Sequence, residues 1–317
     1  RLVESHESPA GNWMEIHIAD FFMLLVNADE EVWPFDVELT ERSLGQLVEL
    51  LRGCRFIADS KASGEVSILP DRSRARNLGA FDTPEPVVRY ITEMVAGPLC
   101  KGDKPPLIVD PACGAGYFLI AALDVLKQNY SNLEPDEILE TSLVGMDVDP
   151  VAIELSKRNI ERHVSQTNGI RLDRKTIDRM LIEVDALSEI DRLPVGMDEA
   201  DGVIGNPPYQ FFSGRGSPVA ALQRSGNEKE SEKLSRELDL LSERFPATSH
   251  GCRDRYKWFI NRAVELLHPG GILGFITPNT WIAYPRYRDI RTLLADEGRF
   301  ISVIDLGAHT FRHAHVP

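Results

Sequence analysis

Short apolar segments alternate with helix-length segments over most of the chain. They are LIVD, SLVGMD, MLIEVDA, GVIGN, GILGFIT and FISVIDLG, at residues 107–110, 142–147, 180–186, 202–206, 271–277 and 300–307. Apolar strands that alternate with helices indicate a parallel sheet with helices packed on both faces. We therefore predict an α/β fold with a doubly wound, Rossmann-like sheet, in a domain that spans residues 76–317.

Two parts of the chain lie outside this alternation. Residues 1–75 have helical spacing, as in IADFFMLLVNA and LTERSLGQLVELLRGCRFI, without strand-type alternation, so we predict a helical N-terminal region. Between residues 210 and 255 lies a polar insertion, NEKESEKLSRELDLLSERF. Its opposite charges, spaced four residues apart, predict a solvated helix.

The composition restricts the function classes. The chain has 317 residues, 43% of them hydrophobic, and a net charge of −14. This charge argues against a broad basic face, the usual signature of a nucleic-acid-binding surface. The longest apolar runs are shorter than the ~20 residues that a membrane-spanning helix needs, and no signal peptide opens the chain. We expect a cytoplasmic protein without membrane contact.

The cysteines and histidines do not predict a metal site. The four cysteines are far apart and include no CxxC pair: Cys54, Cys100, Cys113 and Cys252. We expect reduced thiols, with Cys113 as a small packed residue. Three histidines near the C-terminus have no cysteine or acid at ligand spacing: His309, His313 and His315.

The residues after the predicted strands suggest a ligand site, because open α/β sheets bind ligands at the carboxyl ends of their strands. Asp110 leads into CGAG at 113–116, whose glycines let the backbone approach a ligand at a helix start. A dinucleotide fingerprint needs another glycine where Leu119 stands. Asp147 and Asp185 end the next two strands, where carboxylates can accept hydrogen bonds from ribose hydroxyls and an adenine amine. The pattern indicates a nucleoside without phosphates.

The same acids have a second interpretation. Asp147 and Asp185 also suit helix N-caps, since Asp149-Pro150 starts a helix directly after the second strand. We assign the cap to Asp149 and the ribose contact to Asp147.

The fourth strand ends in Asn206-Pro207-Pro208-Tyr209. Asn-Pro-Pro is a natural turn after any strand. Here it follows a buried strand that comes fourth after a glycine loop, and its prolines fix φ and hold neighbouring hydrogen-bond acceptors in place. We therefore interpret the tetrapeptide as a candidate catalytic site.

Taken in order, these motifs resemble those of adenine-N6 DNA methyltransferases with gamma motif order, as in the catalytic domain of type IIG-like restriction-modification enzymes. The resemblance covers roughly residues 76–317. It rests on GAFDTPEPVVRYITEMV, DPACGAGYF, GMDVDP, VDA, NPPY and DRYKWFINRAVELLHPGGILGFITPNTW. Asp82 is a departure, because family members often have an aromatic residue there.

The resemblance implies the fold of an S-adenosylmethionine (AdoMet)-dependent methyltransferase, with AdoMet as the cofactor. It assigns catalysis to Asn206, Pro207, Pro208 and Tyr209, and base stacking to Tyr209 and Phe311. Phe311 has the alternative of a core position. The cofactor-binding residues that it implies are Thr83, Pro84, Asp110, Ala112, Gly114, Gly116, Phe118, Asp147, Val148, Asp185, Ala186 and Asn206.

The tetrapeptide suits the chemistry of an amine. An exocyclic adenine amine is a poor nucleophile because its lone pair is delocalised into the ring. Hydrogen bonds from the amine to the Asn206 side-chain oxygen and the Pro207 carbonyl would localise this pair and direct it at a sulfonium methyl. The ring of Tyr209 would stack on a base that has left the double helix.

Other functions remain open. NPPY also occurs in methyltransferases that modify a protein glutamine or a ribosomal RNA guanine. The segment before the glycine loop, the block at 254–281 and Phe311 favour DNA adenine. A cofactor-binding scaffold subunit of a DNA-processing assembly is a third possibility, and the intact tetrapeptide argues against it.

The expected partner is double-stranded DNA, bound mostly by a recognition domain that this chain lacks. A nuclease or specificity module is a further expected partner. We predict no nuclease within the chain, because PFDVE at 34–38 lacks the lysine of a nuclease motif. We also expect the last strand of the sheet to be missing after Phe311.

Overall fold

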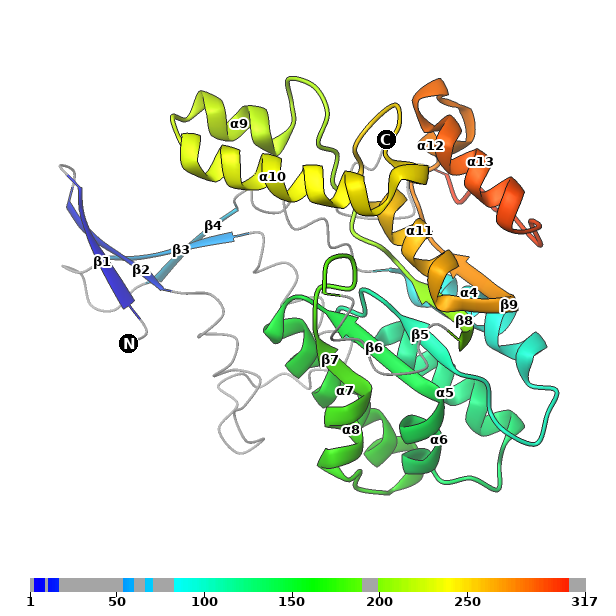
Figure 1. The fold of residues 1–317 in the computed structure, drawn as a ribbon. Helices are drawn as coiled ribbons and strands as arrows, with labels where there is room; N and C mark the ends of the chain where they lie inside the picture. The colour runs from blue at the N-terminus through cyan, green and yellow to red at the C-terminus, as the bar shows by residue number, and fades with distance from the viewer. Residues whose placement is uncertain are drawn as a thin grey trace.

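The computed structural model describes residues 3–8, 11–16, 54–59, 66–70, 83–189 and 199–307, with side chains from residue 83 onward. Its centre is a parallel sheet of five strands in the order β7-β6-β5-β8-β9 (Figure 1). The strands are β5 (Ile108–Asp110), β6 (Leu143–Asp147), β7 (Leu181–Glu183), β8 (Ala200–Gly205) and β9 (Leu267–Phe275).

The strand order reverses beside β5, which confirms the predicted doubly wound sheet. From β5 the chain moves outward through β6 to β7, then crosses back to β8 on the other side of β5. Ile108 is therefore paired with Leu143 on one side and with Gly202 on the other. Such a reversal opens a crevice at the carboxyl ends of the strands, where ligands of this architecture bind.

Three long helices and two short ones cover one face of the sheet. They are α4 (Glu85–Leu99), α5 (Tyr117–Asn129), α6 (Pro135–Ser142), α7 (Pro150–Asn168) and α8 (Arg174–Met180). Ile108, Leu143 and Ile204 point from the strands into this core. Neighbouring strand residues point the opposite way, as the pleat of a strand requires.

The second face packs against α10 (Glu228–Arg244) and α11 (Arg255–Leu266). Val109, Met146 and Val203 contribute to this core from the strands. The two cores together bury the sheet on both faces, so its strands are continuous apolar runs rather than alternating ones.

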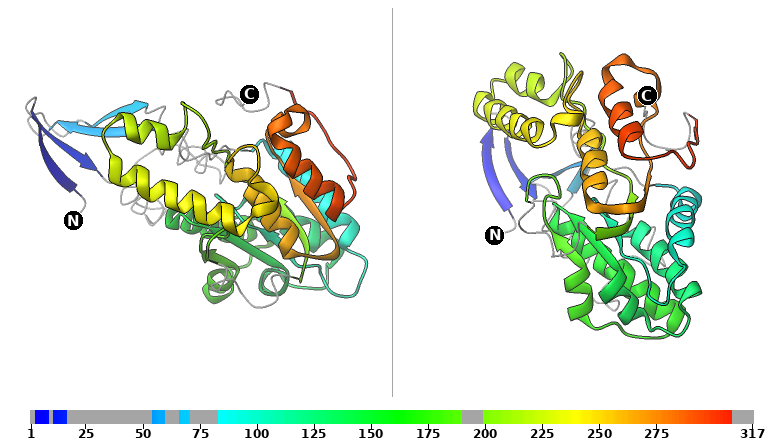
Figure 2. Two further views of the ribbon diagram at one scale, coloured as in Figure 1. Left: turned by 45° about the horizontal axis from the view of Figure 1, so that its top comes forward. Right: turned by 45° about the vertical axis from the view of Figure 1, so that its right-hand side comes forward.

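The predicted helical insertion is present as α9 (Pro218–Arg224) and α10, which lie side by side (Figure 2). The expectation of a purely solvated helix was wrong for α10. Leu238 and Leu241 are buried against the second face of the sheet, while Glu232 and Arg236 form an exposed i,i+4 ion pair. One apolar stripe on an otherwise charged helix is sufficient to dock it.

The helix that follows β6 is defined by its ends. The Asp149 side chain accepts a hydrogen bond from the Val151 amide at 2.8 Å, Pro150 occupies the first helical position, and Gly169 ends α7 in the left-handed conformation. The assignment of Asp149 as the N-cap is therefore confirmed, and Asp147 is left for another role.

After β9 the chain forms α12 (Thr280–Ala283), η5 (Pro285–Tyr287) and α13 (Arg288–Glu297), and α13 lies beside α11. The strand predicted at 300–307 was wrong: this segment has no strand pairing in the described part of the chain, and Ile301 is 67% exposed. An apolar pattern shows that a segment can form a strand, but a strand needs a neighbour's backbone as hydrogen-bond partner.

Residues 1–75 differ from expectation where they are described. They contain an antiparallel sheet of β1 (Val3–Ser8), β2 (Gly11–Ile16), β3 (Cys54–Asp59) and β4 (Val66–Pro70), so the prediction that strands are absent was wrong. Trp13 is paired with Asp59, a contact that local periodicity cannot reveal. Most of the predicted helical segments lie outside the described residues. Among the described helices, none is long and apolar enough to cross a membrane.

Candidate active site

The carboxyl ends of β5, β6 and β8 meet at the crevice. The glycine loop, residues 111–116, connects β5 to α5, and its Cys113 amide donates a hydrogen bond to the Met146 carbonyl in β6 at 2.8 Å. Gly116 has a φ of 82°, and a Cβ there would lie 2.3 Å from Ser156 Oγ. Only glycine readily adopts this φ and also leaves the space beside Ser156 empty. Because Ser156 lies in α7, this helix packs directly on the backbone of the loop.

Asp147, at the end of β6, holds this loop. Its Oδ2 accepts a hydrogen bond from the Gly114 amide at 3.0 Å, and its Oδ1 accepts one from the Asp149 amide at 2.9 Å. The carboxylate thus joins the glycine loop to the start of α7. A carboxylate oxygen can also accept hydrogen bonds from hydroxyl groups, the type of contact that a ribose diol makes.

Asp110, at the end of β5, is fully buried. Its Oδ1 accepts a hydrogen bond from the Ala112 amide at 3.1 Å, whereas its Oδ2 has no hydrogen-bond partner among the described residues. Burial raises the pKa of Asp110 to about 8, and the negative charge of Asp147 adds to the increase. A buried carboxyl with an unsatisfied oxygen is costly unless a cation or donor reaches it.

Gly205 brings the end of β8 against Asp110. Its φ is 145°, and a Cβ at this position would lie 2.7 Å from Asp110 Oδ1. A side chain would therefore separate the two strand ends. The glycine before the tetrapeptide thus sets the distance between the acid and Asn206.

The Asn206 side chain lies between two segments that are far apart in the sequence. Its Nδ2 donates a hydrogen bond to Thr83 Oγ1 at 3.0 Å, and its Oδ1 is hydrogen-bonded to the Tyr209 hydroxyl. Thr83 is buried and directly precedes Pro84, which starts α4. The structure therefore brings together three predicted site residues and fixes the orientation of the Asn206 amide.

Hydrogen bonds of its hydroxyl hold the Tyr209 side chain in place. This group also lies 3.0 Å from the Ile276 carbonyl after β9, so its single proton is shared between that carbonyl and Asn206. Burial raises the pKa of Tyr209 well above its usual range, which keeps the hydroxyl a donor at neutral pH. Pro207 is buried and Pro208 is half-buried, consistent with a rigid loop.

The acid after β7 has a local role in the structure. Asp185 Oδ1 accepts a hydrogen bond from the Leu187 amide at 2.9 Å, and Oδ2 accepts one from the Ser188 hydroxyl at 2.7 Å. These contacts hold a turn, as an N-cap would, although residues 185–189 form no helix. The next residue, Ala186, has its carbonyl bound by Arg262 Nε at 2.8 Å.

The remaining predicted residues differ in their exposure to solvent, and some of them lie outside the described residues. Val148, beside Asp147, is 65% exposed and so is open to a ligand. The Phe118 side chain, in contrast, is buried in the core between α5 and the sheet. Phe311 and the three C-terminal histidines lie outside the described residues.

Two buried polar residues that the sequence analysis missed hold the site. Asn159, in α7, donates from Nδ2 to the Ala115 carbonyl of the glycine loop at 2.9 Å. Arg262, in α11, is buried and binds the loop after β7 from 76 residues away. The signal that could have found them is a polar residue within the apolar face of a predicted helix, because such a residue needs a buried partner.

Three cysteines have described side chains. Cys100, Cys113 and Cys252 are free thiols. Burial raises the pKa of the Cys113 thiol well above its usual range, so it stays protonated and packs as a small apolar group. Within the described residues, no group of three or more His, Cys, Asp or Glu side chains is arranged to hold a metal ion.

Comparisons with known proteins agree on one class of enzyme. The chain is 27% identical over 232 residues to the type II methyltransferase M.TthHB8I of Thermus thermophilus, covering 73% of this chain and 42% of that protein. It is also 27% identical over 224 residues to M.MamI of Microbacterium ammoniaphilum, covering 66% of this chain and 57% of the relative. The chain thus spans about half the length of these relatives.

A solved structure supports the fold. The DrdV–DNA complex, determined by electron cryomicroscopy, superposes with a TM-score of 0.52 at 21% identity, over 70% of this chain and 23% of that one.

The model of the Eco57I restriction-modification methylase family matches residues 141–311, which include β6, the tetrapeptide and α11. Because this match covers more than half of the sequence, the chain belongs to the Eco57I restriction-modification methylase family.

Proposed function

We propose that this chain is the catalytic region of a DNA methyltransferase that transfers a methyl group from AdoMet to the N6 amine of adenine. The observation that carries the proposal is the position of Asn206. Its amide is held between Thr83 and Tyr209 at the end of β8, beside the acids that end β5 and β6. The orientation of this hydrogen-bonding amide is thus fixed at the strand end that lies next to Asp110.

The residues around the glycine loop fit AdoMet. The cofactor has a cationic methionine end, a ribose diol and an adenine. The unsatisfied Oδ2 of Asp110 suits the cationic end, and the Asp147 carboxylate, at the end of β6, is of the type that accepts hydrogen bonds from ribose hydroxyls. The exposed Val148 and the partly buried Asp185 would lie against the adenine. When bound, AdoMet supplies an electrophilic methyl group on a sulfonium.

The chain's own residues act on the amine. Asn206 Oδ1 and the Pro207 carbonyl accept hydrogen bonds from the two amine protons, which concentrates the nitrogen lone pair toward the methyl group. The sulfonium of bound AdoMet would be the methyl donor, and its sulfur would keep the electron pair of the broken bond and leave as a neutral thioether. The methylated amine then releases one proton to solvent, so no side chain has to abstract it beforehand.

Base entry changes the contacts of Tyr209. Its hydroxyl is hydrogen-bonded to Asn206 Oδ1, the acceptor that the amine needs. The Ile276 carbonyl offers the hydroxyl a second acceptor at 3.0 Å. Transfer of the hydrogen bond to Ile276 releases Asn206 Oδ1 without leaving the hydroxyl unsatisfied. The Tyr209 ring then stacks on the base, with Phe311 on its other face.

DNA is the proposed substrate because of the family and because of the DNA-bound structural relative. The net charge of −14 means that other parts of the protein supply most of the phosphate contacts. A recognition domain and a nuclease or specificity module are the proposed partners.

The test is methyl transfer from radiolabelled AdoMet to unmodified DNA, followed by nucleoside mass spectrometry. Asn206→Ala is expected to lower kcat by about 10²- to 10³-fold, since it removes an acceptor used in the transition state, and to weaken AdoMet binding much less than Asp147→Ala does. Asp147→Ala is expected to weaken AdoMet binding by about 100-fold. The matched control is Asn129→Ala, an exposed amide on α5.

Each result identifies a function. N6-methyladenine in the DNA that disappears with Asn206→Ala supports the proposal. Methylation of a protein glutamine or of guanine in ribosomal RNA, with DNA unmodified, replaces it with another amine methyltransferase. AdoMet binding without transfer to any of these substrates indicates a scaffold subunit.

A further inference from the structure

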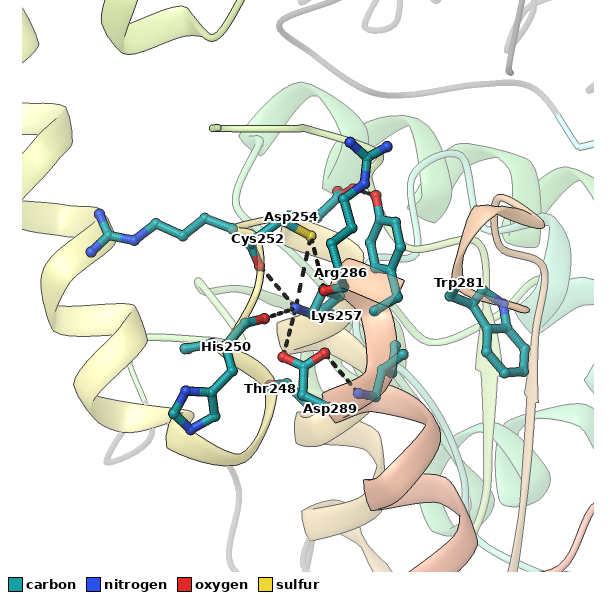
Figure 3. Close-up of polar contacts among 12 residues, drawn as sticks. Thr248, His250, Cys252, Asp254, Lys257, Trp281, Arg286 and Asp289 are labelled. Atoms are coloured by element: carbon teal, nitrogen blue, oxygen red, sulfur yellow. Dashed lines mark hydrogen bonds and ion pairs between the residues drawn. The ribbon is translucent and has the colours of Figure 1, made fainter. Parts of the chain in front are cut away.

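A buried cluster of aromatic and charged side chains packs against Tyr209. Its polar members include Asp254, Lys257 and Asp289 (Figure 3). None of its members was predicted to belong to the site. Its core contains Cys252, Tyr256, Ile260, Tyr287 and Ile290, and Tyr209 packs against it. The cluster therefore forms the support of a catalytic ring.

Lys257 is the charged centre of this cluster, and its side chain is fully buried. Its Nζ donates to the carbonyls of His250 at 2.9 Å and Cys252 at 2.8 Å, and to Asp289 Oδ2 at 2.7 Å (Figure 3). An ammonium has three protons to donate, and all three are used. Lys257 thus joins the segment before α11 to α13 and has no proton left for a ligand.

Tyr256, the neighbour of Lys257, contacts Tyr209 directly. Their rings meet edge to face, with centroids 6.3 Å apart and an interplanar angle of 89°. On its other side, the centroid of the Tyr256 ring lies 6.0 Å from the centroid of the Tyr287 ring. The Tyr287 hydroxyl donates a hydrogen bond to Asp254 Oδ2 at 3.0 Å. Since Tyr256 is fully buried, its ring cannot rotate away without opening the cluster.

The backbone adds a second connection. The Phe212 amide donates to the Arg253 carbonyl at 2.9 Å, and the Arg255 amide donates to the Gln210 carbonyl at 3.0 Å. The residues that follow the tetrapeptide are therefore paired with the segment that Lys257 anchors. Movement of that segment would move the C-terminal end of the Tyr209 loop.

We propose that Tyr256 is a positioning residue that presets the ring of Tyr209, and that the Lys257–Asp289 ion pair holds Tyr256 in place. The inference rests on the proposed function, because the ring position matters for catalysis only if Tyr209 stacks on the substrate. The order of the loop itself can be measured without substrate.

The experiment compares Tyr256→Leu with Phe245→Leu in the full-length protein. Both replace a fully buried aromatic ring, but Phe245 belongs to the core under α10 and not to this cluster. The first measurement is amide hydrogen exchange of peptides covering residues 205–212 without DNA. The second is kcat and KM for DNA, together with the Kd for AdoMet.

Tyr256→Leu is expected to speed exchange in this loop by about tenfold or more, because loop opening no longer disrupts a ring contact. It should lower kcat/KM for DNA by about 10- to 100-fold, as misplaced catalytic groups do, with the AdoMet Kd nearly unchanged. Tyr256→Phe keeps the ring and should restore wild-type kinetics. Phe245→Leu should alter neither the loop exchange nor kcat/KM.

Equal loop exchange in Tyr256→Leu and Phe245→Leu would overturn the inference, as would unchanged kinetics in Tyr256→Leu. If the wild-type protein does not methylate DNA, the proposed function fails, and the exchange comparison still decides whether Tyr256 positions the loop. If Tyr256→Leu does not fold, Asp289→Asn, which weakens the ion pair while keeping its shape, is tested by the same measurements.

Discussion

The two halves of the candidate site are held by different kinds of contact. In the glycine-loop half, Asp110 and Asp147 accept hydrogen bonds from backbone amides of the loop and of the start of α7. In the aromatic half, Asn206 and Tyr209 are held by groups 123 and 67 residues away in the sequence. The acid–amide contacts of the first arrangement join residues at most 33 positions apart, whereas the second depends on how more distant segments pack.

This difference determines where each half is vulnerable. The glycine-loop half depends on backbone conformation and on space, because acids bind amides that only a tight loop presents. The aromatic half depends on two groups that are remote in the sequence, the Thr83 hydroxyl and the Ile276 carbonyl. Substitutions that add atoms should therefore disrupt the glycine-loop half. Substitutions that remove a contact should disrupt the aromatic half.

The largest expected effect comes from breaking the ion pair behind the aromatic half. Lys257→Met keeps most of the side-chain volume but leaves Asp289 buried without its partner, so the free energy of unfolding should fall by about 3 to 5 kcal/mol. Urea denaturation measures this change. The comparison is Lys157→Met, whose partner Asp178 is 49% exposed and which should cost at most about 1 kcal/mol. Equal losses would mean that the buried pair does not support the aromatic half.

The next effect is on the glycine-loop half. Gly116→Ala adds a Cβ that would lie 2.3 Å from Ser156 Oγ, at a φ of 82° that alanine disfavours. Together, overpacking and strain should lower the free energy of unfolding by about 2 to 4 kcal/mol. Adding Ser156→Ala should restore part of this loss, because it removes the clash and leaves the strain.

Gly114→Ala is the matched control for this prediction. Gly114 has a φ of 55°, but no atom lies within 4 Å of the position of its Cβ. The variant should therefore show backbone strain alone, about 1 to 2 kcal/mol. A loss at Gly114 as large as that at Gly116 would show that packing of α7 on the loop contributes little.

The smallest expected effect is the pH dependence of AdoMet binding. Because the pKa of Asp110 is raised to about 8, the free protein holds a proton there at neutral pH, and a cationic ligand must displace it. The affinity for AdoMet should therefore rise as pH increases toward 8, by up to about tenfold per pH unit, and level off above it.

The raised pKa of Asp110 also lowers the free energy of unfolding of the free protein as pH rises from about 4 to 8, since only the folded state keeps the proton.

Calorimetric titration between pH 6.5 and 8.5 measures this dependence. Asp110→Asn removes the titrating group, so its affinity should be weaker and nearly independent of pH in this range. If the wild-type protein shows a flat profile as well, the Oδ2 of Asp110 does not contact the cationic end of the cofactor.

Sequence reasoning was most successful where a pattern determines local backbone structure. The order of strands and helices from β5 to β9, the N-cap at Asp149 and the position of the tetrapeptide directly after β8 agree with the structure. Pairing was less predictable. Residues 300–307 have an apolar strand-like sequence and yet pair with no strand among the described residues, and the short strands of residues 1–75 showed no local periodicity.

By itself the sequence determined the doubly wound order of elements, the glycine loop and the chemical types of the site residues, because each follows from a few neighbouring positions. Only the tertiary structure decided that Thr83 and Tyr209 orient Asn206, and that Lys257 is a buried support rather than a surface charge. The physical reason is the range of the contacts. Backbone conformation is set by adjacent residues, whereas burial and hydrogen-bond partners depend on segments that meet only when the sheet has formed.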